Sequence, residues 1–207
     1  MTTNLAASLY LVSGILFILA LRGLSSPETS RRGNLFGILG MALAITVTFL
    51  FVDILFSGLL FIICALAIGG SIGSIIAYRV SMTAMPQLIA GFHSFVGLAA
   101  VLVALSAFYN PEAFELGTLN NIKTASLIEM SIGASIGAIT FTGSVIAFLK
   151  LQGLMSGTPI TFKGQHFINL LIGIGIVSLI IYVTINQSSH IFWILILMSF
   201  LIGTLLI

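Results

Sequence analysis

Residues 54–78 read ILFSGLLFIICALAIGGSIGSIIAY, a stretch without one charged side chain. Such a stretch provides the roughly 20 apolar residues that an α-helix needs to cross a hydrocarbon core about 30 Å thick. The whole chain has the same character, since 59% of its 207 residues are hydrophobic and only 6% are charged. A water-soluble domain carries roughly a quarter of its residues as charged ones. The composition therefore excludes a soluble globular enzyme, and it equally excludes a disordered tail.

Similar stretches recur along the sequence and predict an all-α, polytopic transmembrane helix bundle in which residues 1–207 form one domain. We expect seven spans, at residues 5–21, 35–52, 54–78, 86–108, 125–149, 167–185 and 191–207. Only the neighbourhood of Asp53 separates the second span from the third, which predicts a tight helical hairpin. The first span is expected to be retained, because Arg22 follows it and no basic residue precedes it, the reverse of a signal peptide.

Charge is distributed unevenly between the predicted loops. Alternation across seven spans places six basic residues on one side: Arg22, Arg31, Arg32, Arg79, Lys150 and Lys163. The opposite side receives Asp53, Glu112, Glu115 and Lys123. The positive-inside rule then predicts an external N-terminus and a cytoplasmic C-terminus. A net charge of +2 is too small for a nucleic-acid surface, and the single cysteine excludes an intramolecular disulfide.

The fourth span contains an ionisable residue, His93, about two turns from its predicted cytoplasmic end. Gly97, Ala100 and Ala104 follow it at helical spacing, and small residues allow neighbouring helices to approach closely. We therefore expect His93 to face the protein interior or a water-filled cavity. Two roles are open from these residues alone: a structural hydrogen bond to a neighbouring helix, or proton handling, which suits a group that titrates near neutral pH.

The fifth span is the most polar one. Glu129 stands near its outer end and precedes Gly133 and Gly137 at intervals of four, so the three share a face and the glycines form a GxxxG pair. Glu129 is either a carboxylate that reaches the outer interface or a proton-entry group. If the fourth and fifth spans are neighbours, Glu129 and His93 bracket a polar path between the two membrane faces.

Other polar or small residues in the spans carry weaker signals. Gly69-Gly70-Ser71-Ile72-Gly73 superficially resembles a phosphate-binding loop, but no strand precedes it, so we expect Gly69 and Gly73 to pack helices. Asp53 is expected to solvate a turn, Asn169 to donate an interhelical hydrogen bond, and Cys64 to be a small buried side chain. No set of residues has the spacing of a metal site.

Three stretches of the sequence are specific beyond their apolar character. The first runs from Arg79-Val80-Ser81-Met82-Thr83-Ala84-Met85-Pro86-Gln87-Leu88 to the segment His93-Ser94-Phe95-Val96-Gly97-Leu98-Ala99-Ala100-Val101-Leu102-Val103. The second is Gly137-Ala138-Ile139-Thr140-Phe141-Thr142-Gly143-Ser144-Val145. The third is the opening segment, Tyr10 to Ile15 with Gly23-Leu24-Ser25 and Glu28-Thr29-Ser30-Arg31 followed by Gly33-Asn34. The first two closely resemble the membrane domain of the proton-translocating NAD(P) transhydrogenase beta subunit, and the third is similar to the N-terminus of that subunit.

The resemblance implies hydride transfer between NAD(H) and NADP(H) coupled to inward proton movement. It implies that His93 translocates protons, that Glu129 matches a membrane carboxylate of the family, and that Ser144 matches the serine of its T-F-T-G-S run. It further implies a dimeric complex with an alpha subunit in a bacterial inner membrane.

The family's further helices and its NADP(H)-binding domain are not found within these 207 residues. We therefore expect this chain to bind neither nucleotide nor metal, and to supply part of the proton path while other polypeptides bind NADP(H) and NAD(H). The alternative is a truncated, non-catalytic remnant or an assembly helix bundle. The partners recovered with the chain would distinguish the two.

Overall fold

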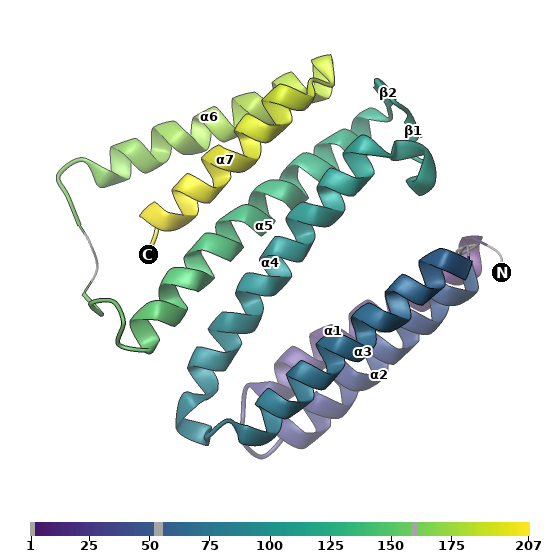
Figure 1. Cartoon of the computed structure of the whole chain (residues 1–207), viewed down its shortest axis with the longest axis vertical. Coiled ribbons are helices and arrows are strands. Elements are labelled where there is room, and N and C mark those ends of the chain that lie inside the picture. The colour runs from purple at the N-terminus through teal and green to yellow at the C-terminus, as the bar shows by residue number, and fades with distance from the viewer. Residues whose placement is uncertain (1–2, 52–55, 159–160) are drawn as a thin grey trace. The chain divides into compact units, whose positions relative to one another are not determined.

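The computed structural model describes residues 3–51, 56–158 and 161–207, and these form seven α-helices (Figure 1). The helices are α1 (Thr3–Leu24), α2 (Ser30–Phe51), α3 (Phe56–Arg79), α4 (Met85–Tyr109), α5 (Thr124–Leu151), α6 (Gln165–Asn186) and α7 (Ser189–Leu205). Each coincides with one predicted span to within a few residues, which confirms a polytopic helical bundle. The turn at Asp53 lies outside the described residues.

Six of the helices, α1 to α6, are long and apolar enough to cross a membrane. The seventh, α7, has 17 residues and therefore extends for roughly 26 Å at 1.5 Å per residue. This is at the lower limit of spanning length. Its composition is nevertheless as apolar as that of the longer helices, since no residue between Ile191 and Leu205 is charged.

A short β-hairpin between α4 and α5 is not predicted from the sequence. Gly117–Thr118 (β1) pairs antiparallel with Asn121–Ile122 (β2), after a 3₁₀ turn at Pro111–Phe114. Asn120 has a φ of 65° between the strands, a conformation that asparagine tolerates better than most residues. Gly117 has a φ of 132° and lies so close to Asn121 that no larger side chain would fit. We call the end of α4 and α5 that carries this hairpin the hairpin end.

The chain divides into two compact units, of which the first comprises α1, α2 and α3. In this unit α1 and α2 are packed closely together. The buried Ser13 hydroxyl of α1 donates a hydrogen bond of 2.7 Å to the Gly40 carbonyl of α2. By contrast, α3 has no buried residue in its spanning segment. The expected tight packing of α3 against α2 is therefore not observed among the described residues.

The second unit comprises α4 to α7, and α5 is its central helix, in contact with α4, α6 and α7. Leu127, Ala134 and Ala138 of α5 are buried against Phe192 and Leu195 of α7 in one apolar core. Phe108 of α4 stacks on the ring of Phe192 with centroids 4.4 Å apart, which attaches α7 to the hairpin end. Val101 and Ala104 of α4 belong to the same core, which therefore joins α5 to both α4 and α7.

Candidate functional site

The site predicted from the sequence is built on the contact between α4 and α5, and this contact depends on two glycines. A Cβ atom on Gly97 would lie 2.6 Å from the Gly137 carbonyl oxygen and 2.7 Å from the Phe141 nitrogen. A Cβ atom on Gly137 would in turn lie 2.7 Å from the Gly97 carbonyl oxygen. The backbones of the two helices are therefore in direct contact at this level, and any larger residue at either position would push the helices apart. Of the predicted small residues, Gly97 and Ala104 are buried, whereas Ala100 stays exposed although its Cβ lies 2.9 Å from a Cβ added to Gly137.

The Gly97–Gly137 contact also fixes the heights of the three predicted site residues, because α4 and α5 run in opposite directions. Counting along each helix at 1.5 Å per residue, His93 lies roughly 6 Å and Ser144 roughly 10 Å from the contact, both away from the hairpin end. Glu129 lies roughly 12 Å from it toward the hairpin end. The two helices are neighbours, as a path between His93 and Glu129 requires. These two residues are separated by roughly 18 Å along the helix axes.

His93 is exposed, so of the two expected surroundings the described residues do not provide the protein interior, and the water-filled cavity stays a prediction. Four residues before Gly97, it is turned by roughly 40° from the contact face. Its Nδ1 lies 2.9 Å from the carbonyl oxygen of Ile89 in the same helix. A carbonyl can only accept, so in this hydrogen bond Nδ1 carries the proton. In the neutral imidazole Nε2 then has a free lone pair.

Glu129 is exposed and does not share the contact face of Gly137. A step of four residues turns a helix by roughly 40°, so two steps place Glu129 roughly 80° away from Gly137. Gly133 has no atom within 4 Å of a Cβ added to it. The predicted GxxxG pair is therefore half correct: Gly137 packs closely, whereas Gly133 does not.

Ser144 is half-buried and lies seven residues after Gly137. Seven residues bring a helix back to within roughly 20° of the same direction, so Ser144 is on the side of α5 that faces α4. Near this end Gly91 of α4 allows the Phe148 ring of α5 to approach, at 3.6 Å from an added Cβ. His93 and Ser144 therefore occupy adjacent levels of one helix pair.

A pair of glutamines joins α4 to the end of α5 that lies away from the hairpin. The Gln87 side chain donates a 2.7 Å hydrogen bond to the Leu151 carbonyl, and Gln152 donates one of 3.1 Å to Gln87. The glycine contact and these hydrogen bonds hold the helices at two levels, on either side of His93. Sequence analysis did not identify this pair, because each glutamine alone is an ordinary polar residue at a helix end.

Two weaker predictions from the sequence are wrong within the described residues. Gly69 and Gly73 do not pack helices, since an added Cβ on either meets nothing within 4 Å. Cys64 is exposed instead of buried. Both predictions required a partner surface that the described residues do not provide. The expected donation of a hydrogen bond by Asn169 stays a prediction, because the atom that is buried without a partner among the described residues is its acceptor, Oδ1.

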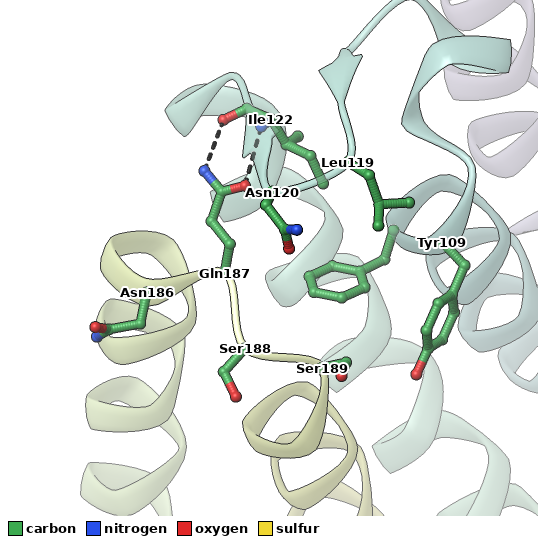
Figure 2. A pocket seen from close by; sticks show the side chains of 9 residues that line it. Tyr109, Leu119, Asn120, Ile122, Asn186, Gln187, Ser188 and Ser189 are labelled. Carbon is green, nitrogen blue, oxygen red and sulfur yellow. Dashed lines mark hydrogen bonds between the residues drawn. The ribbon is translucent and has the colours of Figure 1, made fainter.

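A cavity of about 310 Å³ lies at the hairpin end, between the hairpin and the turn from α6 to α7 (Figure 2). Gln187, with a φ of 51°, forms two hydrogen bonds to one residue: it accepts from the Ile122 N–H at 3.0 Å and donates to the Ile122 carbonyl at 3.2 Å. The amide thus binds the second strand as another strand would, and Figure 2 shows it beside Asn120 and Ser188. No sequence pattern predicted this clamp.

Four serines are buried among the described residues of the second unit, at Ser94, Ser131, Ser135 and Ser199, and Ser94 donates to the Gly91 carbonyl of its own helix. Ser135 and Ser199 each donate to a carbonyl one turn earlier in their own helix. The Ser131 hydroxyl has no partner among the described residues. Part of the polarity that marked α5 in the sequence is therefore internal to the helix and carries no chemistry.

The described residues contain no group of three or more His, Cys, Asp or Glu side chains that could hold a metal ion. The glycine-rich run Gly69 to Gly73 lies inside α3, where backbone N–H groups are used by the helix. Its geometry is that of a continuous helix and not of a phosphate-binding loop.

Comparison with known proteins extends the likeness over almost the whole chain. The family model described as NAD(P) transhydrogenase beta subunit matches residues 6–207. Two curated relatives, both named NAD(P) transhydrogenase subunit beta, come from Rhodospirillum rubrum and from its strain ATCC 11170. Each is 51% identical over all 207 residues, and these cover 44% of the relative's length. The chain therefore spans less than half the length of the relatives it matches.

Proposed function

Because the chain belongs to the NAD(P) transhydrogenase beta subunit family, we propose that it supplies part of the proton path of a transhydrogenase complex. That complex transfers hydride between NAD(H) and NADP(H) and couples the transfer to inward proton movement. An alpha subunit and an NADP(H)-binding domain, both outside these 207 residues, bind the nucleotides. The complex is dimeric and lies in a bacterial inner membrane, in keeping with the bacterial source of the relatives.

His93 is the proposed proton carrier, and the hydrogen bond between its Nδ1 and the Ile89 carbonyl is the observation that supports this role. It stands inside an apolar helix of 25 residues, where an ionisable side chain is expensive unless it serves a function. Its Nδ1–H is held by the Ile89 carbonyl. Nε2 is consequently the atom that takes up and releases the proton, without any change in the bond at Nδ1.

The exposure of His93 has a consequence for the assembled complex. Contact of an imidazolium with lipid costs several kcal/mol. This face of α4 is therefore covered by other helices of the complex, or it lines a water-filled path. Coupling to a distant redox step further requires that Nε2 reach water on one side of the membrane at a time, and this alternating access is part of the proposal.

Glu129 and Ser144 have subordinate roles in this proposal. Glu129, exposed toward the hairpin end, gathers protons at the outer membrane face. Ser144, one level beyond His93, relays a hydrogen bond toward the cytoplasmic end, since a hydroxyl both donates and accepts. The roughly 18 Å between the levels of Glu129 and His93 exceeds one hydrogen bond, so water molecules must connect them.

The test is proton pumping by the complete complex, purified with this chain and reconstituted into liposomes. We expect His93→Ala to abolish pumping, measured with a pH-sensitive dye inside the liposomes, or to uncouple it from the hydride transfer measured in the same sample. Glu129→Gln and Ser144→Ala should reduce pumping less, by about tenfold, because their roles are subordinate and water can replace them in part; a directly transferring group typically contributes roughly 10²-fold or more.

His190→Ala is the matched control, because His190 is an exposed histidine at the start of α7. It should pump at the wild-type rate. Wild-type pumping by His93→Ala would refute the role of His93 in proton transfer. Purification of the chain without any nucleotide-binding partner would refute the proposed complex and favour a non-catalytic remnant.

A further inference from the structure

A second cavity, of about 400 Å³, lies in the first unit, where α1 ends and α2 begins. Its lining combines positive charge, hydroxyl groups and apolar surface in one place. The lining residues are Leu19, Arg22, Gly23, Ser25, Ser26, Thr29, Arg32 and Phe36. None of them belongs to the proposed proton path.

The sequence builds this cavity by repeating one dipeptide, Arg-Gly, at the two ends of the loop. Arg22-Gly23 ends α1, and Arg32-Gly33 opens α2. The two glycines are in direct contact, because a Cβ atom on Gly23 would lie 2.5 Å from the Gly33 Cα. Contact between the glycines brings the preceding arginines to the rim of the same cavity. The proximity of the two arginines to one cavity is thus a consequence of the close contact between the backbones of α1 and α2.

The loop satisfies its own carbonyl groups and so leaves the arginines available. Thr29 donates a 2.6 Å hydrogen bond to the Gly23 carbonyl, and Ser25 donates one of 2.7 Å to the Arg22 carbonyl. Both arginine side chains are exposed. Glu28, the acidic residue of the loop, does not line the cavity. The cavity therefore presents two guanidinium groups without a carboxylate among its lining residues.

The apolar part of the lining identifies the kind of anion. Leu19 and Phe36 lie one turn further into the helices, on the membrane side of the arginines. Guanidinium groups bind phosphate oxygens through paired hydrogen bonds, and basic pockets between helices at a membrane face bind anionic headgroups. A free phosphate would use the arginines and leave the apolar wall unused, whereas a phospholipid uses both.

We propose that this cavity binds one anionic phospholipid, with its phosphate between Arg22 and Arg32 and an acyl chain against Leu19 and Phe36. The site is formed entirely within the α1–α2 hairpin and is independent of the proton path. Its occupant is a lipid of the leaflet on the basic side of the protein.

The experiment is native mass spectrometry of the chain extracted from its membrane in mild detergent, together with whatever subunits accompany it, and titrated with phosphatidylglycerol. We expect one tightly bound lipid, and at least tenfold weaker binding of phosphatidylcholine, which has no net charge. The double variant Arg22→Gln, Arg32→Gln should bind phosphatidylglycerol at least tenfold more weakly. Its helical content, measured by circular dichroism, should be unchanged because both side chains are exposed.

Arg79→Gln is the matched control, since Arg79 is an exposed arginine at the end of α3 that does not line the cavity. It should bind phosphatidylglycerol as the wild type does. Equal losses in this control and in the double variant would overturn the proposal in favour of general surface charge. Phe36→Ala should weaken the binding of phosphatidylglycerol but not the binding of inorganic phosphate. Full displacement of the lipid by millimolar inorganic phosphate would instead make this a free-phosphate site, and the lipid assignment would be wrong.

Discussion

Helices α3 and α5 have similar sequences in one respect and very different surroundings. Each carries two glycines four residues apart, Gly69 and Gly73 in α3 and Gly133 and Gly137 in α5. In α5, 28% of the spanning residues are buried, and Gly137 meets the backbone of α4. In α3, none is buried, and its glycines face open space.

The difference shows what a small-residue motif does and does not specify. Glycine spacing creates a flat stripe on a helix, but close packing also requires a partner with a complementary stripe at the same height. Gly137 has that partner in Gly97, and Gly23 of α1 has one in Gly33 of α2. Gly69 has none among the described residues. A glycine motif therefore allows close helix contact, and the contact forms where the partner helix has a glycine at the same height.

The largest expected difference in stability is between adding a methyl group at the α4–α5 contact and adding one in α3. Gly97→Ala places its Cβ 2.6 Å from a backbone oxygen, so α4 and α5 must move apart. We expect the free energy of unfolding to fall by about 3 kcal/mol, the upper range for overpacking. The measurement is thermal unfolding in detergent, followed by circular dichroism.

Gly69→Ala is the matched substitution in α3, where the added methyl group meets nothing. Alanine is the better helix former, so this variant should be unchanged or more stable by about 0.5–1 kcal/mol. Equal destabilisation by the two variants would mean that α3 has a close-packed partner in the sample. The contrast between the helices would then be lost.

The fold is largely predictable from the sequence because lipid imposes a simple requirement. Every span must bury about 20 residues in hydrocarbon and satisfy its own backbone, which leaves the helix as the form for apolar runs such as residues 54–78. The β-hairpin escaped prediction because its four strand residues form too short a pattern. Its geometry depends instead on positive φ angles at Gly117, in β1, and at Asn120, in the turn.

The site was only partly predictable, for a related reason. Residue type identified His93 as costly in a membrane, and helical spacing identified Gly97 as a packing residue. Spacing could not show that His93 turns away from the α4–α5 contact, since a rotation of roughly 40° separates a buried position from an exposed one. Nor could it reveal contacts between residues far apart in the chain, such as Gln187 with Ile122.

A smaller loss of stability is expected from a substitution at the hairpin end than from one at the glycine contact. Gln187→Asn keeps a residue that tolerates the positive φ of this position, but its side chain is too short for both hydrogen bonds to Ile122. We expect a loss of about 2 kcal/mol, because the buried Ile122 backbone groups lose their partners. Thermal unfolding measures the loss. Asn186→Ala, which removes a hydrogen bond within α6 only, should change stability much less.

The smallest expected effect contrasts two buried serines, one in each unit. Ser13 donates an interhelical hydrogen bond to Gly40, so Ser13→Ala should cost about 0.6–1 kcal/mol, typical of such bonds in membranes. Ser131 is just as buried, but its hydroxyl has no partner among the described residues. Ser131→Ala removes an unsatisfied polar group and should therefore leave stability unchanged or raise it by up to about 1 kcal/mol. If Ser131→Ala proved as destabilising as Ser13→Ala, the Ser131 hydroxyl would have a partner in the assembled protein, and α5 would be a polar-contact helix on that face as well.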